Sequence, residues 1–83
     1  MTSRFVHGRK YRFKQDFYYE QAAPLKSALI KKGTIVIFDC PNLGFARFRL
    51  TDKHLIEQLD ATHISLKPKD AFAVLEEVSN EIT

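Results

Sequence analysis

Four side chains have the chemistry of metal ligands or nucleophiles: His7, Cys40, His54 and His63. A local metal site takes two ligands from one turn of the chain, as in the spacings C-x-x-C and H-x-x-x-H. None of the four residues stands at such a spacing from another. Histidines placed in this way are usually surface or half-buried polar residues. We therefore expect no metal site and no cofactor.

The residues that could support catalysis are dispersed as well. Asp52, Glu57 and Asp60 share one segment, but their spacing is ordinary for the solvated face of a helix. Cys40 follows an apolar run and precedes Pro41, a setting that suits a small buried side chain better than an activated thiol. The glycines are isolated, so no phosphate-binding loop exists. The sequence predicts a protein that is not an enzyme and has no catalytic residue.

Positive charge is concentrated at the start of the chain. The net charge of +3 is a mild excess, but the five basic residues before Asp16 are accompanied by no acid, whereas Glu76, Glu77 and Glu81 follow Val74 with no base. This asymmetry predicts an electropositive first segment, which could contact phosphates. The candidate nucleic-acid or partner-binding residues are Arg9, Lys10, Arg12, Lys14, Tyr18, Arg47 and Arg49, with Arg4 also in the basic segment. The alternative is that these charges only solvate one face of a strand.

The stretch KYRFKQDFYY, residues 10–19, must position these charges. Its rings Tyr11, Phe13, Phe17 and Tyr19 occupy odd positions, and most charges occupy even ones. A period of two indicates a half-buried strand, because successive side chains point to opposite faces. The four rings are therefore expected in the core. The charges and Tyr18 would remain on the other face, where a tyrosine ring could stack on a base.

A second strand begins at Ile35, where four consecutive apolar residues predict burial on both faces and a central place in the sheet. The stretch FARFRL, residues 45–50, alternates and completes a hairpin with it after a turn within residues 40–44. Arg47 and Arg49 would extend the basic surface if their strand lies beside the first. Leu43 and Phe45 at the hairpin tip are the candidate protein-docking residues.

The rest of the chain combines clear and ambiguous signals. Residues 52–60 predict a short helix capped by Thr51 or Asp52, and HISL, residues 63–66, predicts a strand. We favour a strand over about residues 71–76, although Phe72, Leu75 and Val78 could line a helix instead. Residues 24–32 are either a loop or a short helix that begins at Pro24.

Composition indicates one folded domain over residues 1–83, with disordered ends at 1–8 and 78–83. The single cysteine suits a reducing compartment, and no apolar run is long enough to cross a bilayer. We expect a cytoplasmic protein with no membrane partner, either a monomer or a weak homodimer.

The order of a charged aromatic strand, KKGTIVIF, FARFRL, a helical turn and AFAVLEEV resembles small Src-homology-three-like (SH3-like) β-barrel proteins of phage or prophage origin. The resemblance implies a mainly β fold, either a small SH3-like barrel or a curled antiparallel sheet of about five strands, with one short helix at about 52–60. It also implies non-catalytic binding. The chain has no tryptophan, which argues against recognition of proline-rich peptides. We expect a protein-interaction or accessory factor, and nucleic-acid binding through the basic strand is the alternative.

Overall fold

The computed structural model describes residues 5–21 and 26–78, which form two antiparallel sheets and two short helices. The five-stranded sheet has the order β6-β5-β4-β1-β7, and its strands are β1 (Lys10–Phe13), β4 (Ile35–Asn42), β5 (Phe45–Leu50), β6 (His63–Leu66) and β7 (Leu75–Glu77). The second sheet pairs β2 (Phe17–Gln21) with β3 (Lys26–Ile30). The helices are α1 (Lys53–Leu59) and α2 (Pro68–Val74). The mainly β prediction is confirmed, and the sheets do not close into a barrel.

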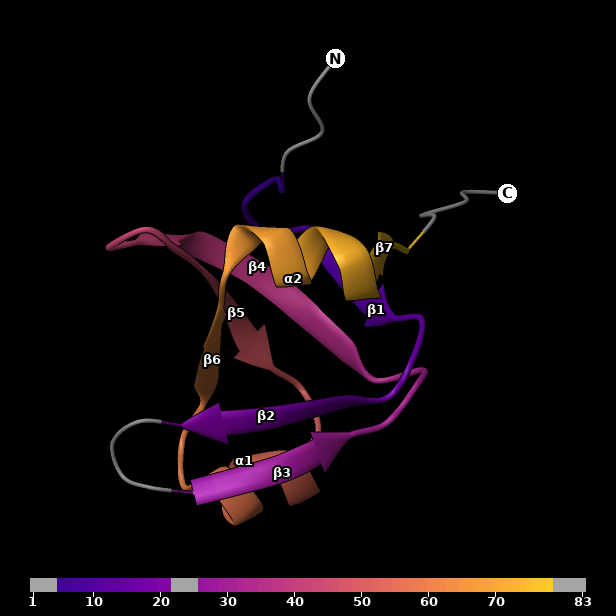
Figure 1. The fold of residues 1–83 in the computed structure, drawn as a ribbon, viewed down its shortest axis with the longest axis vertical. Helices are drawn as coiled ribbons and strands as arrows, with labels where there is room; N and C mark the ends of the chain where they lie inside the picture. Colours follow the sequence, from indigo (N-terminus) through magenta and orange to yellow (C-terminus); the bar gives the residue numbers. More distant parts are fainter. Residues whose placement is uncertain (1–4, 22–25, 79–83) are drawn as a thin grey trace.

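The core is shared by both sheets and both helices. Figure 1 shows α2 at one end of the molecule and the β2–β3 sheet with α1 at the other. The largest fully buried side chains are Phe13, Ile30, Val36, Phe48, Leu59 and Ile64. Ala71 and Val74 of α2 join the same cluster. Every element thus buries one face, as expected for a chain that can form a single core.

The hairpin of β4 and β5 is confirmed, and β4 is the central strand of the larger sheet, as its apolar run predicted. The predicted burial on both faces is wrong, because Ile35 and Ile37 lie on the outward face and are only half-buried. The turn is tighter than expected, because Asn42 pairs with Phe45 and only Leu43 and Gly44 lie between the strands. The ladder has a bulge at Asp39, where the register shifts between Phe38 and Cys40.

The single strand expected over residues 10–19 is wrong, because the chain leaves the larger sheet after Phe13 and enters the smaller one at Phe17. Asp16 lies in the connection and accepts a hydrogen bond from the Lys32 backbone N–H at 2.8 Å. The rings of Phe13 and Phe17 still face the same core, with centroids 6.1 Å apart. The alternation of apolar and polar residues therefore continues across the turn, and the sequence pattern does not show where the first strand ends.

Helix α1 begins where its capping residue predicts. The side chain of Asp52 accepts a hydrogen bond from the backbone N–H of His54 at 2.8 Å. Leu55 and Leu59, one turn apart, are buried. Asp60 closes the helix in the left-handed conformation and its N–H bonds to the carbonyl of Ile56.

Removal of this cap gives the first prediction. Asp52→Ala is expected to lower the free energy of unfolding by about 1 kcal/mol, because a helix-end N–H loses its acceptor. Urea unfolding measures the change, and Glu57→Ala, which removes the same charge from the exposed side of α1, is the control. Equal midpoints for the two variants would contradict a capping role for Asp52.

The favoured strand over residues 71–76 is wrong for residues 71–74, which belong to α2. Pro68 stands at the first helical position and Asp70 in the first turn, both favourable at a helix start. Ala71 and Val74 form the buried side of α2, and the chain turns to strand only at Leu75. Tertiary packing selected the helix, because a three-residue spacing buries these two side chains together.

Both alternatives for residues 24–32, a loop and a short helix, are wrong for residues 26–30, and residues 24 and 25 lie outside the described residues. The segment is β3, and its Ala28 and Ile30 are buried while Leu29 between them is exposed. All five residues of β3 pair with β2. A partner strand along the whole segment outweighs a weak helical stripe.

The edges of the larger sheet are the short strands β6 and β7, because β5 pairs with β6 on its second side. Strand β5 therefore has no free edge with which a second copy of the chain could pair. Neither α1 nor α2, the helices of the described ranges, is long and apolar enough to cross a membrane.

Candidate functional site

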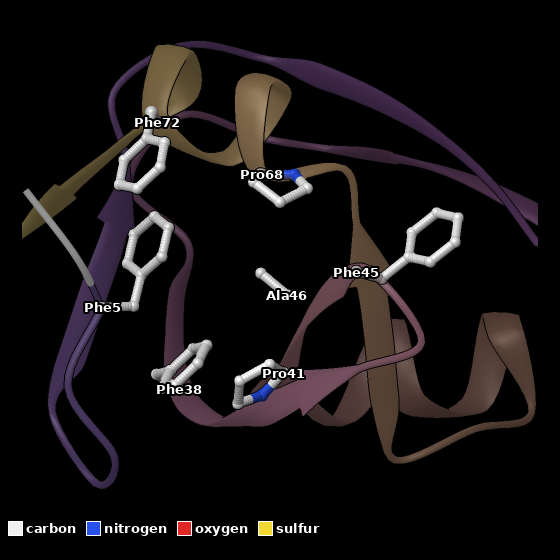
Figure 2. Close-up of a pocket in the computed structure, with 8 residues that line it drawn as sticks. Phe5, Phe38, Pro41, Phe45, Ala46, Pro68 and Phe72 are labelled. Atoms are coloured by element: carbon white, nitrogen blue, oxygen red, sulfur yellow. The ribbon is translucent and has the colours of Figure 1, made fainter. Parts of the chain in front are cut away.

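An apolar hollow of about 400 Å³, here called the apolar groove, lies between the β4–β5 hairpin and α2 (Figure 2). Its lining residues are Phe5, Phe38, Pro41, Gly44, Phe45, Ala46, Pro68 and Phe72. None of these side chains carries a charge or a polar atom. Such a concave apolar surface is typical of a site for an apolar ligand group.

One wall of the groove is a stack of aromatic rings. Figure 2 shows Phe5 between Phe72 and Phe38. The Phe5 and Phe72 centroids are 4.7 Å apart with an interplanar angle of 11°, and the Phe5 and Phe38 centroids are 5.6 Å apart at 25°. Phe5 also meets the core ring of Phe48 edge to face. The core therefore supports this wall from below, and Phe45 lies at the opposite rim of the groove.

Hydrogen bonds hold the chain around Phe5 in place. The N–H of Val6 donates to the Tyr11 hydroxyl at 2.9 Å, and the N–H of Gly8 donates to the Phe38 carbonyl at 2.9 Å. Residues 5–8, expected in a disordered end, are thus packed on the larger sheet. Residues 1–4 and 79–83 of the expected ends lie outside the described residues.

The hairpin tip presents Leu43 to solvent, with 92 % of its surface exposed. Leu43 and Gly44 have φ angles of 51° and 84°, so both central residues of this two-residue turn are left-handed. Glycine and asparagine suit such a turn, whereas leucine is disfavoured there. An exposed leucine in a disfavoured conformation is a candidate binding residue.

Leu43→Asn is accordingly expected to raise the free energy of unfolding by about 0.5–1 kcal/mol, because asparagine tolerates a positive φ. Chemical denaturation of the two proteins measures the difference. Leu43→Ala is the control, since it removes the apolar side chain and keeps an unfavourable residue in the turn. A midpoint for Leu43→Asn no higher than that of Leu43→Ala would show that the turn stores no strain.

The structure separates the predicted basic residues. Arg47 and Arg49 belong to β5, which does not adjoin β1 because β4 lies between them. Tyr18 lies on β2 of the other sheet, where it is 58 % exposed and its hydroxyl donates to Ser27 Oγ at 2.8 Å. The seven candidates therefore do not form one continuous surface with a ring at its centre.

Strand β7 neutralises part of the basic segment. Arg9 pairs with Glu77, and Arg12 Nε lies 3.0 Å from Glu76 Oε2. These pairs are exposed and contribute little to stability. They nevertheless bring a negative charge to two of the four arginine and lysine residues proposed in residues 9–14. Lys14 follows β1 and is exposed.

Asp39, at the bulge of β4, lies between two basic side chains. Its Oδ2 is 3.6 Å from Arg47 Nε and 3.7 Å from His63 Nε2. Burial and the nearby Arg47 charge lower the pKa of His63 below its ordinary value of 6.5, Asp39 opposes this effect, and Arg49 adds to it. At neutral pH His63 is therefore mainly uncharged, and the ionic partner of Asp39 is Arg47.

Within the described residues, no three histidine, cysteine or acidic side chains gather as a metal site would require. Cys40 is half-buried, and its thiol lies 3.8 Å from Asp39 Oδ2. The apolar groove is therefore the candidate binding site that we consider further.

Sequence reasoning identified Phe45 but missed the other rings of the groove. Phe5 was assigned to a disordered end, and Phe72 to a strand. The signal for Phe72 was present, since a proline at residue 68 followed by Asp70 is typical of a helix start. Phe5 had no such signal, because its neighbours in the groove are distant in the sequence.

Comparisons with protein families, curated proteins and solved structures gave no match to this chain. The resemblance to SH3-like phage proteins stays a prediction from the sequence.

Proposed function

We propose that the protein is a non-catalytic binding module that holds a segment of a partner protein in the apolar groove. The observation that supports this proposal is the groove itself, with four phenylalanines and two prolines around a hollow of about 400 Å³. Apolar side chains kept at a concave surface gain free energy when a ligand displaces water from them.

The proposed occupant is a peptide segment with a large apolar side chain next to acidic residues. Lys67 and Lys69 flank Pro68 at the groove and are exposed, whereas Asp70 is the acid nearest to them in sequence and is half-buried. This excess of positive charge is complementary to acidic residues on the peptide.

Strand addition is a less suitable mode for such a peptide. The edge strands β6 and β7 of the larger sheet have four and three residues, the two strands of the second sheet have five each, and such short edges limit pairing. The Ser65 backbone N–H of β6 already donates to the Tyr19 hydroxyl at 3.2 Å. The side chains of the groove, rather than a free sheet edge, are therefore the proposed recognition element.

The proposed setting is the cytoplasm, and the single cysteine supports it. An accessory role of phage or prophage type is also part of the proposal, and it rests on the sequence resemblance alone. No cofactor is required for binding of this kind.

Selection of a random peptide library on the protein tests the proposal. The enriched peptides are expected to combine an aromatic or large aliphatic side chain with acidic neighbours, and to shift the amide NMR signals of Gly44, Phe45 and Phe72. Peptides that shift only signals remote from the groove would contradict the proposal. A failure to enrich any apolar peptide would do the same.

A further inference from the structure

The face of the larger sheet that is turned away from the core carries a row of residues from four strands. Lys10 of β1 pairs with Ile37 of β4, Ile37 with Arg49 of β5, and Arg49 with His63 of β6. Paired residues of adjacent strands point to the same face, and the strands are about 4.8 Å apart. Lys10 and Arg49 therefore stand about 10 Å apart on either side of Ile37.

These two cations are not neutralised by neighbours in residues 5–21 and 26–78, where neither side chain forms an ion pair. The neighbouring arginines do form ion pairs: Arg12 pairs with Glu76, and Arg47 pairs with Asp39. The end of the row at His63 is mainly uncharged at neutral pH. The available positive charge of this face is thus concentrated at Lys10 and Arg49.

The surface beside Arg49 is concave. A hollow of about 220 Å³ is lined by His7, Gly8, Ile37, Phe38, Asp39 and Arg49. The carboxylate of Asp39 is the acid of this hollow, and it lies within 4 Å of Arg47 and His63. An anion that enters from the Lys10 side would meet the guanidinium of Arg49.

We propose that this face binds the phosphodiester backbone of nucleic acid, with Lys10 and Arg49 contacting separate phosphates. A row of separated cations suits a ligand with regularly repeated anions, and phosphates provide such a repeat. The row itself contains no phenylalanine or tyrosine, and Tyr18 lies on the other sheet, so the proposed binding rests on phosphate contacts rather than on base stacking. Binding is accordingly electrostatic, and its affinity is the same for different base sequences. This proposal is independent of the apolar groove.

Fluorescence anisotropy with labelled DNA, single-stranded and duplex, tests the proposal between about 50 and 200 mM salt. Binding is expected to weaken as salt rises. Lys10→Ala and Arg49→Ala are each expected to reduce the slope of log K against log salt by about 0.7 for single strands or 0.9 for duplex. Arg49→Lys should preserve the slope, because it keeps the charge. The two DNA forms distinguish which geometry of the backbone the face accepts.

Lys26→Ala is the matched control, since it removes one positive charge from β3 of the other sheet. Its salt slope should equal that of the parent protein. Equal losses for all three alanine variants would overturn the proposal by showing a general charge effect. Two further results would overturn it: no DNA binding at the lower salt concentration, or equally tight binding of polyglutamate, which would assign the face to acidic proteins. Circular dichroism of each variant verifies its fold.

Discussion

Phe48→Ala is expected to lower the free energy of unfolding by about 3–5 kcal/mol, the range for loss of a fully buried phenylalanine. Phe48 has no exposed surface. Its ring lies edge to face with Phe5, Tyr11 and Phe38, at centroid distances of 5.1, 6.1 and 5.3 Å. The variant would lose these contacts and leave a cavity, because surrounding rings anchored on separate elements cannot all move inward.

A loss of this size approaches the whole stability of a domain of this length, which is about 4–12 kcal/mol at about 0.05–0.15 kcal/mol per residue. Thermal and urea unfolding measure the effect, and Phe48→Leu, which keeps most of the volume, should be milder. Phe45→Ala is the control, because it removes the same ring at a position that is 40 % exposed. If Phe48→Ala is no more destabilising than Phe45→Ala, the ring cluster does not support the fold.

Phe45→Ala is expected to weaken binding of a groove-selected peptide by about 2 kcal/mol, or roughly 30-fold. Phe45 lies at the rim of the groove opposite the Phe5 stack, and exposed aromatic residues of a binding site often supply much of its affinity. Its partial exposure means that the fold depends on it less than on Phe48. Isothermal titration calorimetry measures the dissociation constant.

Tyr18→Ala serves as the control for this measurement, since it removes an exposed ring from the second sheet. Its peptide affinity should remain within about twofold of the parent value, well under the 1.4 kcal/mol of a tenfold change. Equal losses in Phe45→Ala and Tyr18→Ala would mean that the peptide recognises exposed rings in general. Unchanged affinity in both variants would remove the hairpin from the site.

The sequence was sufficient to predict burial, strand position and the start of a helix where these depend on residues nearby in the chain. Alternation predicted that Tyr11 and Phe13 are buried, and the apolar run from Ile35 predicted the central strand. Asp52 marked the start of α1 because capping is a contact within one helical turn. Local chemistry also placed Leu43 and Phe45 at an exposed hairpin tip.

Tertiary structure decided the ambiguous segments. Residues 71–74 carried both a helical and a strand pattern, and residues 26–30 were open between helix and loop. The neighbours available in the fold selected a helix for the first segment and a strand for the second. The groove is likewise a product of the fold. It joins Phe5, the hairpin and α2, whose separation along the chain leaves no local pattern.

The electrostatics show the same division most clearly. The sequence determined that the first segment is basic and the last acidic, and it predicted an electropositive end. The antiparallel pairing of β1 with β7 places Glu76 and Glu77 beside Arg12 and Arg9, so the charges of these two arginines are offset. Coulomb energy depends on distance in space, and the sheet, rather than the order of residues, sets that distance.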